Sequence, residues 1–122
     1  MRYYDELLRE TRGPFTVVVD KTWEDLHPRD MFEEDDIDEI CRKIDNGTYD
    51  WFMLRTRVLF EGIELSSEYL GCCLYEDAKE VLTDGMAEDQ IYQAMLHAKV
   101  ELANLKKKFA AVDENLVDEL CC

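Results

Sequence analysis

Carboxylates are concentrated in one stretch of the chain, between residues 24 and 39. Nine acids stand there against one base, Arg29, so this stretch contributes −8 to the net charge of −15. The acids are Glu24, Asp25, Asp30, Glu33, Glu34, Asp35, Asp36, Asp38 and Glu39. Carboxylates three or four residues apart on a helix lie about 5–6 Å from each other. Phosphates advance about 3.4 Å per nucleotide along a duplex axis while winding around it, which gives a comparable spacing. This pattern predicts an acidic surface that fits a basic, nucleic-acid-binding groove.

The same acids also have an ordinary structural explanation. Acidic residues in the first turn of a helix offset the unpaired N–H groups there, and basic residues such as Arg42 and Lys43 do the same at the other end. Two or three acids are enough for that purpose, and this stretch holds nine. A dedicated binding surface and a solvated helix start therefore remain alternatives.

Histidines and cysteines give no pattern of a metal site or a nucleophile. His27 and His97 are far apart in sequence, and no C-x-x-C motif accompanies them. The cysteines are Cys41, Cys72, Cys73, Cys121 and Cys122, an odd number with two adjacent pairs. We therefore expect reduced thiols with a packing role, no disulfide framework and no bound metal.

Catalytic motifs are also missing from the sequence. There is no G-x-S-x-G, P-loop, G-x-G-x-x-G or H-E-x-x-H. Carboxylates are so abundant that no single pair stands out for acid–base chemistry. We expect a protein that is not an enzyme, with no catalytic residue and no cofactor.

Length and composition predict one domain over residues 1–122. The hydrophobic share of 47% is that of an ordinary globular protein, whereas the net charge of −15 and the pI of about 4.4 are unusual for this size. Such a charge repels nucleic acid and anionic membranes and attracts basic surfaces. No apolar run reaches the length of a membrane span, and the first residues lack an apolar signal region. We expect a soluble, cytoplasmic protein, in a host cell if it is phage-encoded.

The N-terminal half contains two predicted helices and one strand. Residues 2–10 have an amphipathic helical pattern that ends at Gly13-Pro14. Residues 15–20, FTVVVD, form a β-branched run that is typical of a strand. A second helix shows an apolar face at helical spacing, made of Ile37, Ile40, Cys41 and Ile44, and ends at Asn46-Gly47.

Residues 50–71 predict a β-hairpin that turns at Glu61-Gly62. Placing Phe60 opposite Ile63 makes one face largely apolar, with the pairs Val58/Leu65, Thr56/Ser67, Leu54/Tyr69 and Phe52/Gly71. The other face then pairs Arg57 with Ser66 and Arg55 with Glu68. A three-residue loop with Gly62 in a bulge is the competing register.

The C-terminal part predicts a short helix over residues 75–83 and then a long one. Its apolar residues repeat at alternating intervals of four and three, which is a heptad seam: Ile91, Met95, Ala98, Leu102, Leu105, Phe109, Val112 and Leu116. A helix of about 25–33 residues exceeds the length that strands of ordinary size cover. Its far half therefore either dimerises or breaks near Ala110-Ala111 and folds back.

Together these elements predict an α+β fold in the order α-β-α-β-β-α-α. We expect a small three-stranded antiparallel sheet with helices on one face and a long C-terminal helix.

One segment also carries a resemblance. Between Tyr49 and Asp77 the chain contains Trp51-Phe52, Arg55, Arg57-Val58, Gly62, Tyr69-Leu70-Gly71, Cys72-Cys73 and Tyr75-Glu76. With these residues it resembles a class of small accessory proteins of bacteriophages and mobile elements. The resemblance implies a host-interacting role of the anti-defence kind, such as that of anti-CRISPR proteins, and it carries over no catalytic residues.

Two functions follow as expectations. The first is a non-enzymatic inhibitor whose acidic stretch mimics nucleic acid. It would bind a basic surface of a host protein or ribonucleoprotein complex, without contacting nucleic acid or membrane directly. The alternative is a homodimeric structural or adaptor protein that associates through the heptad seam, with acidity serving only solubility.

Overall fold

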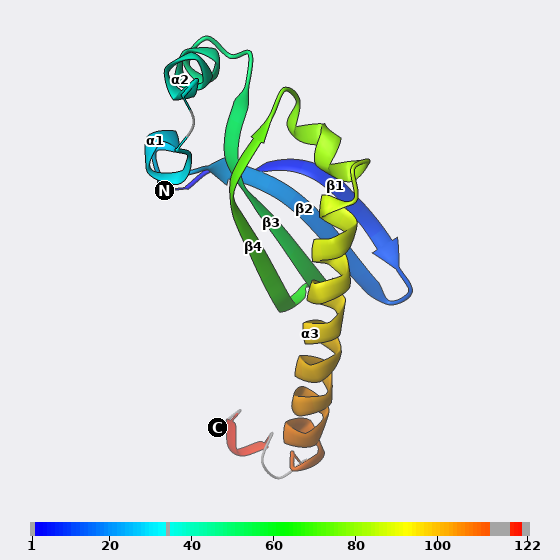
Figure 1. Cartoon of the computed structure of the whole chain (residues 1–122). Coiled ribbons are helices and arrows are strands. Elements are labelled where there is room, and N and C mark those ends of the chain that lie inside the picture. The colour runs from blue at the N-terminus through cyan, green and yellow to red at the C-terminus, as the bar shows by residue number, and fades with distance from the viewer. Residues whose placement is uncertain (1, 34, 113–117, 121–122) are drawn as a thin grey trace.

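A twisted antiparallel sheet and one long helix form the body of the protein (Figure 1). The structure, a computed structural model, describes residues 2–33, 35–112 and 118–120. The strands are β1 (Asp5–Arg12), β2 (Phe15–Trp23), β3 (Asp50–Phe60) and β4 (Ile63–Tyr75), in the spatial order β1-β2-β3-β4. The helices are α1 (Pro28–Met31), α2 (Ile37–Asp45), the 3-10 helix η1 (Ala78–Leu82) and α3 (Met86–Ala110).

The fold class is α+β, but the predicted three-stranded sheet is wrong, because the sheet has four strands. The extra strand is β1, formed by residues that the sequence pattern assigns to a helix. Strand β2 pairs with β1 along one edge and with β3 along the other, and its Val17, Val18 and Val19 are at most 1% exposed. Pairing with β2 outweighs the helical preference of residues 2–10, and Gly13, at φ 60°, makes the tight turn between them.

The hairpin turns at Glu61-Gly62 as predicted, and Phe60 pairs with Ile63. Glu61 takes a positive φ of 49° and Gly62 one of 79°, so the loop has two residues and the three-residue alternative is wrong. Beyond Leu59 the predicted register is wrong, because two bulges in β4 each insert a residue. The first bulge shifts the partners by one, giving the pairs Val58/Ser66, Arg57/Ser67, Thr56/Glu68, Arg55/Tyr69 and Leu54/Leu70. The second, at Gly71-Cys72, places Cys73 rather than Gly71 opposite Phe52.

The hydrophobic core lies between one face of the sheet and the first half of α3. Apolar side chains of β2, β3 and β4 pack against Ile91, Ala94 and Ala98, whose small alanines allow the helix to approach closely. Hydrogen bonds fix the helix on the sheet, because Thr56 donates to Gln90 Oε1 at 2.9 Å and Ser66 donates to the Ala94 carbonyl at 2.7 Å.

Helix α3 has 25 residues and ends at Ala110, at the short end of the predicted length and at the predicted break. It is roughly 38 Å long at 1.5 Å per residue. It extends beyond the sheet, and its last turns lie past the tip of the β3–β4 hairpin (Figure 1).

The opposite face of the sheet carries a buried ion pair. Asp20 is 3% exposed and accepts two hydrogen bonds from Arg55, from Nε at 2.8 Å and from Nη2 at 2.6 Å. Arg57 lies 3.6 Å from the same carboxylate, and the Arg55 guanidinium stacks 3.5 Å from the centre of the Tyr4 ring. This face is therefore held together by charge-assisted hydrogen bonds rather than by a second layer of apolar side chains.

Candidate functional site

The predicted acidic residues gather on a projection at one end of the sheet. We call residues 24–45 the acidic projection; it contains the end-of-strand loop, α1 and α2 and stands off the sheet beyond β2 and the start of β3 (Figure 1). Helix α2 spans the residues that the apolar spacing predicts, with Ile40 buried. Glu34 lies outside the described residues.

Trp51, the second residue of β3, fastens the projection to the sheet. Its indole Nε1 donates to the Leu26 carbonyl at 2.9 Å, and the Phe32 ring packs edge-on against it with 5.7 Å between ring centres. The loop before α1 and the loop before α2 are thus held by one side chain. The sequence pattern does not reveal this, because the contact depends on the path of the loop.

Glu24 belongs to this attachment rather than to the exposed surface. Its carboxylate accepts the backbone N–H groups of Cys72 at 2.8 Å and of Leu26 at 3.2 Å. Cys72 lies in the second bulge of β4 with a left-handed φ of 59°. A Cβ added at Gly71 would lie 2.8 Å from Glu24 Oε2, so glycine there leaves room for the carboxylate.

Three of the predicted acids take part in ion pairs within the molecule. Asp25 Oδ2 lies 2.5 Å from Arg2 Nη2, and Asp38 pairs with Arg29. Glu39 Oε1 lies 3.5 Å from Lys43 Nζ, one helical turn away. These pairs are exposed and screened by solvent, so they reduce the local charge without removing it.

The remaining four described acids are exposed and have no ion pair or side-chain hydrogen bond within the part of the chain that the structure describes. They are Asp30, Glu33, Asp35 and Asp36. Asp30 lies in α1, Glu33 and Asp35 lie in the α1–α2 connection, and Asp36 is the N-cap residue of α2. The predicted surface therefore divides into a structural anchor, a paired group and a free group.

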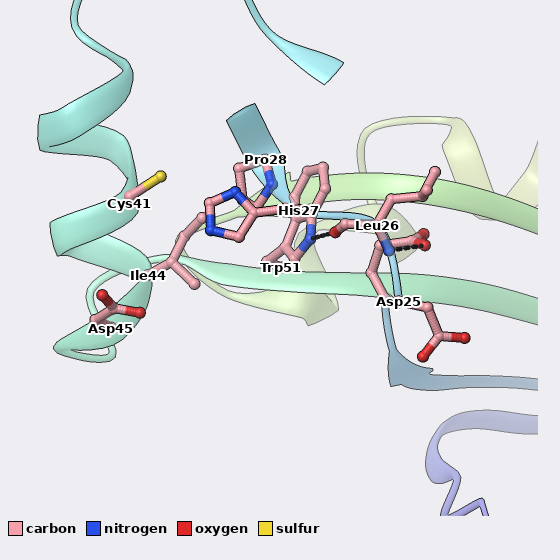
Figure 2. A pocket seen from close by; sticks show the side chains of 9 residues that line it. Asp25, Leu26, His27, Pro28, Cys41, Ile44, Asp45 and Trp51 are labelled. Carbon is pink, nitrogen blue, oxygen red and sulfur yellow. Dashed lines mark hydrogen bonds between the residues drawn. The ribbon is translucent and has the colours of Figure 1, made fainter. Parts of the chain in front are cut away.

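A cavity of about 230 Å³ lies within the acidic projection, between α2 and the loop after β2 (Figure 2). Its lining consists of Glu24, Asp25, Leu26, His27, Pro28, Cys41, Ile44, Asp45 and Trp51. His27 Nδ1 accepts a hydrogen bond from the Arg29 N–H at 3.1 Å, and the other ring nitrogen, Nε2, takes no part in this bond. An indole ring, apolar walls and carboxylates in one small cavity suit the side chain of a lysine or arginine.

The sequence pattern does not mark this cavity, because its walls come from three separate segments. The only available signal is that Asp45 extends the acidic character to the far end of α2.

The surroundings of the histidines and of Cys72 and Cys73 bear on metal binding and on nucleophilic chemistry. His97 lies on α3 beside Glu68, whereas His27 is the N-cap residue of α1. Within the described residues, no three metal-binding side chains lie together. Burial raises the pKa of the Cys73 thiol to about 11, and burial followed by the nearby Glu24 carboxylate raises that of Cys72. Both thiols stay protonated near neutral pH, which is the opposite of nucleophile activation.

The predicted heptad seam changes surroundings along its length. Ile91 and Ala98 are buried against the sheet, and Met95, Leu102 and Leu105 are partly buried. Phe109 and Val112 are exposed, whereas Leu116 lies outside the described residues. The first half of the seam is therefore used by the chain's own sheet.

Comparison of the chain with protein-family models, with curated proteins and with solved structures gave no match. Among the described residues, no helix combines the length and apolar character needed to cross a membrane.

Proposed function

We propose that this protein is a non-enzymatic inhibitor that binds a basic, nucleic-acid-binding surface through its acidic projection. The observation that carries the proposal is the group of four exposed acids, Asp30, Glu33, Asp35 and Asp36, on a part of the molecule that stands away from the sheet. The resemblance of residues 49–77 to phage accessory proteins suggests the setting, which is a CRISPR-like defence complex of the host.

Exposed carboxylates on a projecting element suit this role for electrostatic reasons. The net charge of −15 steers the protein toward basic partners. The free acids are exposed on the acidic projection, where a partner can reach them. Arginines and lysines that contact phosphates in such a partner form equally good charge-assisted hydrogen bonds with carboxylates. Occupying those residues excludes the nucleic acid that they normally bind.

The cavity beside Trp51 adds a specific contact to this general attraction. Its volume of about 230 Å³ is smaller than the 300–1,000 Å³ typical of small-molecule sites, and it is suited to a single long side chain. An arginine of the partner that enters the cavity places its guanidinium near the Trp51 ring, while Asp45 lies on the opposite side, on α2 (Figure 2). Such an anchor fixes the orientation of the partner, which a diffuse acidic field does not.

The proposal predicts that nucleic acid and salt both displace the partner. The immobilised protein is used to capture binding proteins from a host lysate, and the captured proteins are then challenged with duplex DNA, with structured RNA and with increasing salt. A partner that contacts the acidic projection through phosphate-binding residues is released by the nucleic acid that it recognises, and its affinity falls steeply as salt rises. Capture that resists both nucleic acid and salt contradicts the proposal.

A second function, that of a dimeric structural protein, is favoured by one specific observation. Phe109 in the last turn of α3 and Val112 just after the helix are exposed. In this alternative the acidity only maintains solubility, and the charge variants described below leave its interactions unchanged.

A further inference from the structure

A second cavity lies where the N-terminal residues, the end of β2 and the start of β3 meet. Its volume is about 280 Å³, and its lining includes four aromatic residues, Tyr3, Trp23, Trp51 and Phe52. Phe52 is only 1% exposed, whereas Tyr3 is 73% and Trp23 45% exposed. The cavity therefore combines a buried aromatic ring with aromatic side chains that a solute can reach from outside.

The charged residues of this cavity favour a cation. They are Asp5, Asp50 and Lys21, two carboxylates against one ammonium group. Lys21 Nζ donates to the Asp50 carboxylate, so these two charges offset each other and the exposed Asp5 supplies the remaining negative charge. The net charge of −15 adds to this preference, because the field of the whole protein raises the local concentration of cations.

Aromatic rings of this cavity already attract cations of the chain itself. The Arg2 guanidinium lies 4.5 Å from the centre of the Trp23 ring, and Lys21 Nζ lies 5.8 Å from the centre of the Phe52 ring. Arg2 is not among the lining residues, so it does not fill the cavity. A cation is attracted to the negative face of an aromatic ring, and several rings around one cavity strengthen that attraction.

The hydrogen bonds of the lining distinguish between kinds of cation. The Asp50 carboxylate accepts a hydrogen bond from Lys21, and the Tyr3 carbonyl accepts one from Thr22 Oγ1. A guanidinium or a primary ammonium group that leaves water needs acceptors for its N–H groups, and these two acceptors are already engaged. A trimethylammonium group has no N–H, so aromatic rings and one nearby carboxylate are sufficient for it.

We propose that this cavity binds a trimethylammonium group. The group belongs either to a methylated lysine side chain or to a small quaternary amine such as choline, and the recognition is the same in both. This site does not rest on the proposed function, because none of the four free acids of the acidic projection lines the cavity.

NMR titration of the isotope-labelled full chain tests the proposal. The chain has two tryptophans, Trp23 and Trp51, and both line the cavity, so their indole N–H signals report on it directly. Choline chloride is expected to shift both signals saturably, with a dissociation constant of about 1 mM or less, whereas equimolar sodium chloride does not. The neutral carbon analogue of choline, in which a tert-butyl group replaces the trimethylammonium group, is expected to bind at least about tenfold more weakly because it lacks the charge.

Short peptides separate the two sources of the group. A peptide with one trimethyllysine that binds more tightly than choline indicates a methylated protein, and a peptide that binds no better than choline indicates a small amine. The same peptide with unmodified lysine is expected to bind at least about tenfold more weakly than the trimethylated one, because its ammonium group is strongly hydrated.

Two tyrosine variants locate the binding. Tyr3→Leu removes an aromatic ring from the cavity and is expected to weaken choline binding by at least about fivefold. Tyr92→Leu is the matched control, because Tyr92 is 63% exposed on α3 and lies outside the cavity. Three results overturn the proposal: choline leaves both indole signals unchanged, the carbon analogue binds as tightly as choline, or the two variants lose affinity equally.

Discussion

At the scale of single residues, one hydrogen bond joins the end of the sheet to the start of α3. Tyr75 donates its phenolic proton to Asp84 Oδ2 at 2.6 Å, and Asp84 Oδ1 accepts the Met86 N–H at 2.9 Å. The bond to Asp84 raises the pKa of Tyr75 to about 12, and the bond from Tyr75 lowers that of Asp84. These shifts make the stability of the protein depend on pH in two separate windows.

The Tyr75–Asp84 bond predicts a loss of stability at both extremes of pH. Asp84 has a lowered pKa in the folded protein, so its contribution is present above its ordinary value of 3.8 and is lost as pH falls further. Tyr75 has a raised pKa, so its contribution is present below pH 10.0 and is lost as pH rises toward about 12. Urea unfolding across pH measures this, with Tyr75→Phe compared with the wild type. The stability difference between the two should be largest at neutral pH, and a difference independent of pH contradicts the assignment.

At the scale of elements, the acidic projection depends on few attachments to the body of the protein. Trp51 and Glu24 supply three of its hydrogen bonds, and two of these join it to other elements: Trp51 to the Leu26 carbonyl and Glu24 to the Cys72 N–H. A projection held in this way opens at a lower free-energy cost than the sheet itself.

Trp51→Phe is expected to loosen the projection while the sheet stays intact. Phenylalanine keeps an aromatic ring beside Phe32 but removes the indole donor, and an ordinary hydrogen bond contributes about 1 kcal/mol. Amide hydrogen exchange should quicken by roughly fivefold within residues 24–45 and remain unchanged in β2 and β3. Trp23→Phe, which removes an indole bond to the exposed Asp25, serves as the control and leaves exchange in α2 unchanged.

The elements differ in how far their sequence determines them. Helix α2 and the Glu61-Gly62 turn follow from local spacing, which the residues themselves carry. The end of α3 at Ala110 does not, because the apolar spacing continues to Leu116. Strand β1 does not, because residues 2–10 have a helical pattern and become a strand only through pairing with β2. The bulges of β4 are equally hidden, since they insert Leu65 and then a residue at Gly71-Cys72 into an otherwise regular alternation. The acidic stretch is visible in sequence, but the division into anchoring, paired and free acids depends on partners as distant as Arg2 and Cys72.

At the scale of the whole molecule, charge and apolar surface are separated. The free acids lie on the acidic projection, and an apolar groove lies between the end of α3 and the tip of the β3–β4 hairpin, lined by Phe60, Ile63, Leu65, Leu102, Leu105, Lys106 and Phe109. Figure 1 shows these elements at opposite ends of the molecule. The two ends of the molecule therefore present different surfaces, one acidic and one apolar. The central claim concerns the first of these ends, and it requires that the position of the acids, not the total charge, determines binding.

A pair of charge-reversed variants with the same net charge tests that claim most directly. Glu33→Lys/Asp35→Lys changes two free acids of the projection, and Glu80→Lys/Asp89→Lys changes two exposed acids elsewhere. Each variant carries two reversals, so both move from −15 to −11. Affinity for the captured basic partner is measured by isothermal titration calorimetry at physiological salt. The account predicts at least about a tenfold loss for the first variant and less than about a threefold loss for the second. Equal losses for the two variants would contradict it, because binding would then follow net charge alone.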